Sequence, residues 1–141
     1  MNILIKTTVN RNFREIFARF NLDLFVALKP PVVNLVVERF DGCKKGDEVH
    51  LKINGQRWVS HITEFFESDD EIYFIDRGAI IPAPLSNWKH IHRIVRTGEN
   101  SSVVIDDIEY TTGNRVLDKI MFPVLYTMFL LRRPIYKKKL S

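Results

Sequence analysis

The middle of the chain alternates between apolar and polar residues. Six segments there are rich in β-branched and aromatic residues and are separated by short turn signals. This pattern is typical of strands with one covered face. The six predicted strands are residues 33–40, 47–53, 56–66, 71–81, 87–96 and 102–111, and residues 3–9 have the composition of a seventh. Asn54-Gly55 predicts a tight hairpin, because both residues tolerate positive φ.

Helical spacing marks the two remaining parts of the chain. Phe13, Ile16, Phe17 and Phe20 recur at the period of a helix, for which we expect Asn10 to be the N-cap. Residues 21–28 predict a second short helix, which Pro30 and Pro31 would end. A long amphipathic helix is predicted from Asn114 to about Lys139, with Pro123 at a kink or in its first turns. Its apolar stripe is Leu117, Ile120, Met121, Val124, Leu125, Met128 and Leu131.

This order of elements predicts an α+β fold in which seven antiparallel strands have their helices on one face. One long helix does not fill the concavity of a curved sheet of this size. We therefore expect a cavity between the sheet and the C-terminal helix. The unbroken apolar run IMFPVLYTMFLL has 12 residues, and a helix needs roughly 20 to span a bilayer.

Length and composition fit one globular domain over residues 1–141, with 45% hydrophobic and 27% charged residues. The net charge of +4 comes from the end of the chain, where the last ten residues carry five positive charges and no acid. Nucleic-acid binders more often spread basic residues along a face. We therefore expect no nucleic-acid partner.

The single cysteine, Cys43, cannot form an internal disulfide, which is compatible with a reducing cytoplasm. The first residues have neither a long apolar run nor a small-residue cleavage site. We therefore expect no signal peptide and a cytoplasmic protein. Cys43 has no acid–base partner nearby in the sequence, so a nucleophile role has little support.

The candidate chemistry centres on the stretch WKHIHR, residues 88–93. Residues two apart in a strand share a face, so Trp88, His90 and His92 point the same way. The opposite face carries Lys89 and Arg93, which suit solvent. We therefore predict that the histidines face the C-terminal helix. There they would lie opposite Asp76 and Asp106 of the flanking strands and satisfy their hydrogen bonds.

The segment FIDRGAIIPAPLSNWKHIHRI resembles a pattern of bacterial members of the START-related (SRPBCC) superfamily: Phe-x-Asp, a proline-containing loop, and Trp-x-His-x-His-x-apolar. Asp106, Ile108 and Tyr110 resemble that family's Asp-x-Val-x-Tyr, and FLLRRPIYKKKL resembles the end of its final helix, where an arginine follows an apolar stretch. The resemblance covers nearly the whole chain and points to the polyketide cyclase/dehydrase-like branch. It implies the helix-grip fold and a central cavity that binds hydrophobic small molecules.

Three interpretations of the histidines and carboxylates remain open: a structural polar network, groups that orient a ligand's polar head, or a general base assisted by a carboxylate. The first candidate function is binding or transport of a lipid, polyketide or aromatic molecule. The alternatives are a cyclase- or dehydratase-type enzyme with His90 or His92 as base, and an interaction module with a filled cavity. We expect neither a metal ion nor a cofactor. The predicted ligand-binding residues are Phe74, Asp76, Trp88, His90, His92, Asp106, Tyr110, Met121, Leu125 and Met128.

The basic tail has two interpretations. Its five positive charges favour the negative end of the helix dipole and are solvated. Alternatively, they draw the protein weakly to anionic membranes, with Tyr136 and Leu140 as interfacial anchors.

Overall fold

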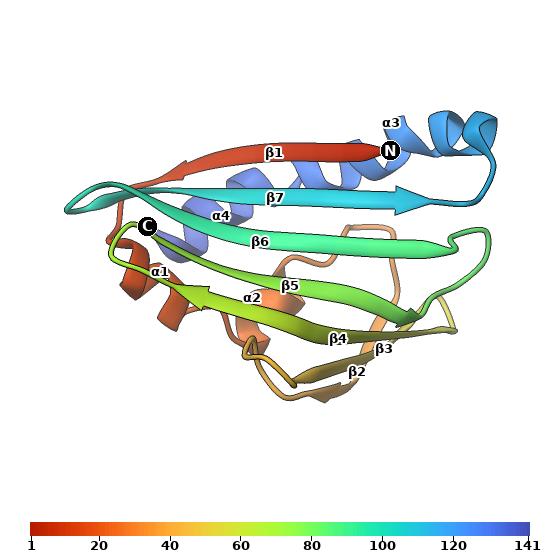
Figure 1. Cartoon of the computed structure of the whole chain (residues 1–141), viewed down its shortest axis with the longest axis horizontal. Coiled ribbons are helices and arrows are strands. Elements are labelled where there is room, and N and C mark those ends of the chain that lie inside the picture. Colours follow the sequence, from red (N-terminus) through yellow and green to blue (C-terminus); the bar gives the residue numbers. More distant parts are fainter.

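The computed structural model describes residues 1–141. Seven antiparallel strands form one sheet in the order β1-β7-β6-β5-β4-β3-β2 (Figure 1). All six predicted hairpin-connected strands are present, as is the N-terminal strand. The elements are β1 (Asn2–Val9), α1 (Phe13–Ala18), α2 (Leu22–Ala27), β2 (Leu35–Phe40), β3 (Glu48–Ile53), β4 (Gln56–Glu67), β5 (Glu71–Ile80), β6 (Asn87–Gly98), β7 (Ser101–Thr111), α3 (Arg115–Leu130) and α4 (Arg132–Leu140).

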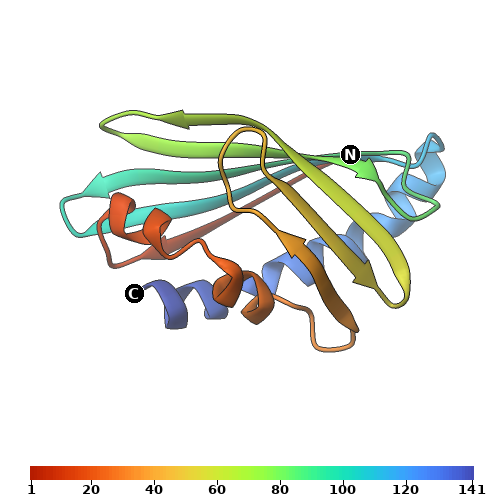
Figure 2. The same cartoon turned by 90° about the horizontal axis from the view of Figure 1, so that it is seen from below.

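All four helices lie on one side of the sheet (Figure 2). The predicted hairpin at Asn54-Gly55 is confirmed, because both residues have positive φ, 52° and 80°. The predicted cap of α1 is wrong by two residues. Asn12, not Asn10, accepts a hydrogen bond from the backbone N–H of Arg14, while a turn from Val9 to Arg11 ends β1 first.

The long C-terminal helical segment is confirmed, with a break at Leu131 that divides it into α3 and α4. Pro123 lies inside α3. No helix is both long enough and apolar enough to cross a membrane. The predicted apolar stripe is partly wrong: Met121, Leu125 and Met128 are half-buried, but Ile120, Val124 and Leu131 point to solvent. Apolar side chains occur on both faces of α3, so spacing alone did not identify the face that packs on the sheet.

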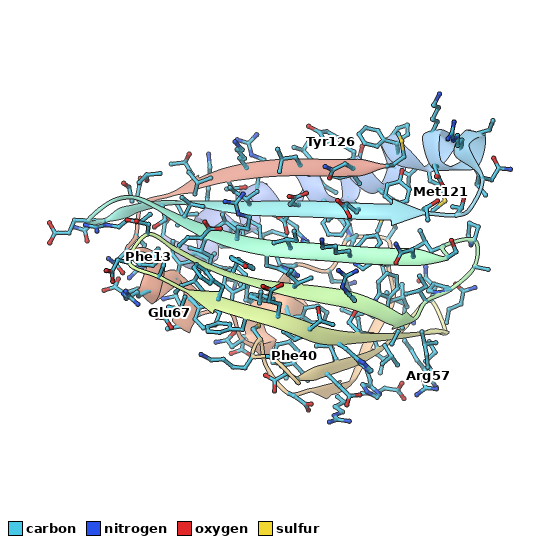
Figure 3. The ribbon with its side chains drawn as sticks, viewed as in Figure 1. Phe13, Phe40, Arg57, Glu67, Met121 and Tyr126 are labelled. Carbon is cyan, nitrogen blue, oxygen red and sulfur yellow. The ribbon has the colours of Figure 1, made fainter.

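The core consists of two apolar clusters at opposite ends of the concave face. One joins α1, α2 and α4 to the sheet and includes Phe13, Ile94 and Tyr136. The other includes Trp88 and Ile108, and Met121 and Tyr126 of α3 pack against it. Figure 3 shows Phe13 and the pair Met121 and Tyr126 at these two ends.

A row of polar residues crosses the sheet between the two clusters. On β6, His90 and His92 lie between Trp88 of one cluster and Ile94 of the other. On β7, Asp106 separates Val104 from Ile108 in the same way. We call Thr7, Asp76, His90, His92 and Asp106 the polar belt. The fold thus places the candidate site across the middle of the concave face.

Candidate functional site

Strand pairing brings the predicted site residues together. Asp76 of β5 lies opposite His90 of β6, and His92 lies opposite Asp106 of β7. Trp88 and His90 are buried, His92 is half-buried, and the Lys89 and Arg93 side chains are on the other face. The prediction that the histidines face the helices is therefore confirmed.

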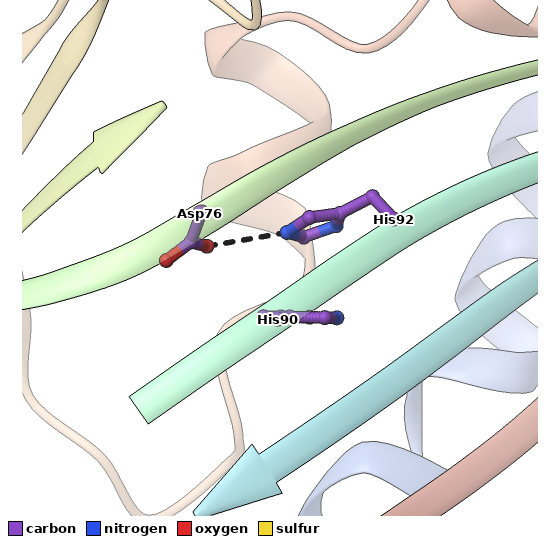
Figure 4. A group of neighbouring side chains, drawn as sticks. All are labelled: Asp76, His90 and His92. Atoms are coloured by element: carbon purple, nitrogen blue, oxygen red, sulfur yellow. Dashed lines mark hydrogen bonds and ion pairs between the residues drawn. The ribbon is translucent and has the colours of Figure 1, made fainter. Parts of the chain in front are cut away.

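Each histidine pairs with a carboxylate on a different neighbouring strand. His92 Nε2 lies 3.2 Å from Asp76 Oδ2, and His90 Nε2 lies 2.8 Å from Asp106 Oδ1. The imidazole N–H donates in both bonds, because an ionised carboxylate only accepts. The two rings stack with centroids 3.6 Å apart. Figure 4 shows the bond from His92 to Asp76 with His90 beside it on β6.

Asp106 is the centre of a second set of contacts, with the C-terminal helices. Its Oδ1 lies 3.4 Å from Nη1 of Arg132 and 3.3 Å from the hydroxyl of Tyr136, which donates to it. Asp106 and Tyr136 are fully buried, and the Arg132 side chain is 15% exposed. A buried carboxylate is stable only when it is paired, and Arg132 supplies the opposite charge.

These contacts determine the charges at neutral pH. Burial lowers the pKa of His90 to about 4, and the nearby His92 adds to this, so His90 is neutral. Burial alone would raise the pKa of Asp106, but the hydrogen bond from His90 and the charge of Arg132 outweigh it and hold that pKa at about 2. Burial alone would also raise the pKa of Asp76, but the hydrogen bond from His92 outweighs this effect and lowers that pKa. Both carboxylates are therefore ionised.

A cavity of about 220 Å³ lies between the sheet and the helices, beside the polar belt. It is lined by 29 residues, of which 20 are hydrophobic. Asp76, His92 and Arg132 are among its few polar members. An interaction module with a filled interior would have no such space, so the cavity argues against that alternative. Pockets of this kind, apolar with a few placed polar groups, are typical of small-molecule sites.

Most, but not all, of the predicted ligand-binding residues line the cavity. Seven of the ten line it: Phe74, Asp76, Trp88, His90, His92, Leu125 and Met128. Asp106, Tyr110 and Met121 do not. Asp106 lies behind His90, Tyr110 donates to the backbone oxygen of Asp118 at 2.7 Å, and Met121 packs in the cluster around Trp88. Alternation placed Asp106 and Tyr110 on the right face of β7, and helical spacing did the same for Met121 on α3, but neither pattern shows how far along an element a cavity extends.

Sequence reasoning missed two parts of the lining. Arg132 was counted with the basic tail, yet its guanidinium turns into the cavity and lies 4.5 Å from the centre of the Phe129 ring. The arginine after the apolar stretch was the signal that could have identified it. The wall formed by Phe20, α2 and β2 was also missed, because its residues are far from WKHIHR in sequence. It includes Phe20, Leu24, Phe25, Leu28 and Phe40.

Two further residues of the cavity lining, Trp58 and Cys43, carry a polar or reactive group. Trp58 packs edge-on against Trp88 and donates from its indole N–H to the hydroxyl of Ser60 at 2.8 Å, so it is part of the wall. Cys43 lies 3.6 Å from the backbone oxygen of Phe20, and burial raises the pKa of its thiol to about 12. A thiol that stays protonated at neutral pH is a poor nucleophile.

Asp76, His90 and His92 are also the residues whose possible ligand atoms lie close enough together to hold a metal ion. Each offers one ligand atom, and the three atoms lie within 4.8 Å of one another. Nε2 of both histidines is, however, already bonded to a carboxylate. A metal ion bound by His92 Nε2 and Asp76 Oδ2 would have to break the hydrogen bond between them.

Comparisons of sequence identify no family. No protein-family model matches the chain, and no curated protein matches it.

Comparisons of structure are informative about the fold. An uncharacterised protein of Bacillus thuringiensis is 13% identical with a TM-score of 0.64, covering 94% of this chain and 95% of that one. Norcoclaurine synthase of Thalictrum flavum, a point mutant with a transition-state analogue, is 13% identical with a TM-score of 0.65, covering 88% and 82%. The same enzyme in complex with dopamine and hydroxybenzaldehyde is 11% identical with a TM-score of 0.61, covering 96% and 86%.

This chain has the helix-grip fold. The likeness to norcoclaurine synthase agrees with the resemblance to the START-related superfamily at the level of the fold. At these identities it extends no further, because function depends on the site rather than on the fold. The polyketide cyclase-like branch stays a prediction.

Proposed function

We propose that the protein binds a hydrophobic small molecule, such as a lipid, polyketide or other aromatic compound, in the cavity between the sheet and the helices. The observation that carries this proposal is the distribution of polarity in the cavity. Its walls are mostly apolar, and Asp76, His92 and Arg132 are gathered at the polar belt. Burying an apolar ligand against such walls contributes roughly 25 cal/mol per Å², and the polar residues orient its one polar end.

The charges indicate what that polar end is. Arg132 neutralises Asp106 through direct contact, and His90 is neutral. Asp76 is the other ionised carboxylate; His92 donates to its Oδ2, and its buried Oδ1 has no hydrogen-bond partner. A ligand with a hydroxyl or other hydrogen-bond donor at this end therefore fits better than an anionic one, which would add negative charge to a buried site.

A catalytic function is the second candidate, and one contact favours it. His92 lines the cavity while its Nε2 is bonded to Asp76. A carboxylate that orients an imidazole and stabilises its protonated form is the arrangement used by histidine bases. His90 is less suitable, because its Nε2 is committed to Asp106 in the interior. Norcoclaurine synthase, which shares the fold, has been seen with dopamine and hydroxybenzaldehyde.

Native mass spectrometry of the purified protein tests the binding proposal directly. We expect an excess of a few hundred daltons over the denatured mass, lost on denaturation, from a co-purified organic ligand. An excess equal to one divalent ion would instead make Asp76, His90 and His92 a metal site. If no organic excess appears and no apolar compound quenches or shifts the fluorescence of Trp58 and Trp88, the proposal is wrong.

The paired variants Asp76→Asn and His92→Ala distinguish a carrier from an enzyme once a ligand is identified. A carrier should lose roughly tenfold in affinity for the hydroxylated ligand, the value of about one hydrogen bond, and keep its affinity for the analogue without the hydroxyl. An enzyme should lose turnover while binding persists. His61→Ala, an exposed histidine of β4, is the matched control and should change neither.

A further inference from the structure

The outer face of α3 carries an apolar stripe that nothing in the chain covers. Val116, Ile120 and Val124 are spaced four residues apart, so they lie on one line along the helix. They are 68%, 64% and 62% exposed, and Leu131 continues the line at 44%. At 1.5 Å per residue the stripe is roughly 22 Å long. We call these four residues the α3 stripe.

The exposed charges of the two helices that carry and follow the stripe are all of one sign. Between Arg115 and the end of the chain, Asp118 is the only acidic residue. It is buried, where its carboxylate accepts hydrogen bonds from Thr111 and Thr112. The exposed charges of α3 and α4 are therefore positive without exception: Arg115, Lys119, Arg133, Lys137, Lys138 and Lys139. α4 follows α3 along the same side of the sheet (Figure 2).

The residues that the sequence suggested as membrane anchors are not available. Tyr136 and Leu140 are both 0% exposed and belong to the core cluster of α1 and α4. The prediction that they anchor the tail at an interface is therefore wrong. If the basic residues bring the protein to a membrane, the apolar contact has to come from elsewhere on the helical side.

We propose that the α3 stripe, with the basic residues beside it, docks on an anionic lipid surface. An amphipathic helix lying in the interface buries its aliphatic side chains among the acyl chains, while lysine and arginine bind the headgroups. The proposal does not depend on what the cavity binds.

A second copy of the chain is a less suitable occupant. Packing two α3 stripes against each other would bring the basic residues of both copies together, with no exposed acid on either α3 or α4 to pair with them. Like charges at such short range oppose association. An anionic surface removes this repulsion, because every exposed charge of the segment then faces one of opposite sign.

Docking in this way would place the cavity close to the lipid. Leu125, Met128 and Phe129 on the inner side of α3 line the cavity, one helix width from the stripe. The same helix would then be a wall of the cavity on one face and a lipid contact on the other.

Vesicle co-sedimentation of the full-length protein tests the proposal. The probes are vesicles of phosphatidylcholine alone and of phosphatidylcholine with phosphatidylglycerol. We expect binding to the mixed vesicles that weakens at high salt, and little binding to the neutral ones. The double variant Ile120→Ser, Val124→Ser should bind at least roughly tenfold more weakly, because its lost methylene groups no longer enter the acyl region. Lys137→Gln and Lys138→Gln should each reduce affinity by roughly fivefold.

Leu4→Ser is the matched control, since it removes a half-exposed aliphatic side chain from β1 and should bind like the wild type. Circular dichroism on each variant confirms that it is folded. Three results would overturn the proposal: no difference between the two kinds of vesicle, full binding by the stripe variant, or a wild-type dimer that the stripe variant turns into a monomer. The last result would assign the stripe to self-association.

Discussion

At the scale of single residues, the histidines and carboxylates of the polar belt form two pairs with different surroundings. The pair of His90 and Asp106 is buried and tied to Arg132 and Tyr136 of α4. The pair of Asp76 and His92 borders the cavity. The first connects sheet and helix, and the second is placed to meet a ligand. The first pair fits the structural interpretation of WKHIHR, and the second is the pair on which the proposed ligand binding depends.

The buried pair predicts a pH dependence of stability. The pKa of His90 is about 4 in the folded protein against an ordinary 6.5. The unfolded chain therefore binds more protons between these values, and stability falls as pH drops from 6.5 to 4. At about 1.4 kcal/mol per pKa unit the loss is on the order of 3 kcal/mol. The lowered pKa of Asp106 extends the loss below pH 3.8.

Urea unfolding followed between pH 4 and pH 7 measures this slope. His90→Gln keeps a donor for Asp106 but cannot take up a proton, so the part of the slope due to His90 should disappear. His61→Gln, at an exposed position, should leave the slope unchanged. An unaltered slope in His90→Gln would contradict the assignment of a buried, neutral His90.

At the scale of elements, the start of α3 connects the sheet to the C-terminal helices. Asn114 caps α3 by accepting from the backbone N–H groups of Val116 and Leu117. One turn later, Asp118 accepts from Thr112 at the end of β7. The cap begins the helix, and Asp118 attaches it to the last strand.

Asn114→Ala should lower the free energy of unfolding by about 1 kcal/mol, because two helix N–H groups lose their acceptor. Asn114→Asp, which keeps a side-chain oxygen, should be close to the wild type. The denaturation midpoint at constant m-value is the measurement. Equal losses in the two variants would mean that the cap is not what stabilises this helix end.

At the scale of the whole molecule, the last turn of the chain is part of the core. Leu140 is fully buried beside residues of β1 and α1, and its backbone oxygen accepts from Arg11 Nε at 2.7 Å. The basic tail is therefore not a free extension. Its three lysines are exposed, while Tyr136 and Leu140 turn inward.

Leu140→Ala should destabilise the protein by roughly 2–5 kcal/mol, the range for truncating a buried leucine. Lys139→Ala, one residue earlier and exposed, should stay within about 0.5 kcal/mol of the wild type. Thermal and urea unfolding of both variants test this. If Leu140→Ala had no larger effect than Lys139→Ala, the docking of α4 on the core would be wrong.

The sequence by itself determined the strands, their order and the face of β6 that carries His90 and His92. These depend on local alternation and on turns such as Asn54-Gly55, which act over a few residues. That the histidines share a face with Asp76 and Asp106 followed from the same alternation, once the strands were taken as neighbours.

Only the tertiary structure decided which side of α3 is covered, that Tyr136 and Leu140 are buried, and that Arg132 enters the cavity. Each depends on contacts between residues far apart in the chain, and α3 is apolar on both faces, so its spacing fits either orientation. Packing against the sheet selects one face of the helix. That choice is what leaves Val116, Ile120 and Val124 exposed and brings Arg132 to Asp106.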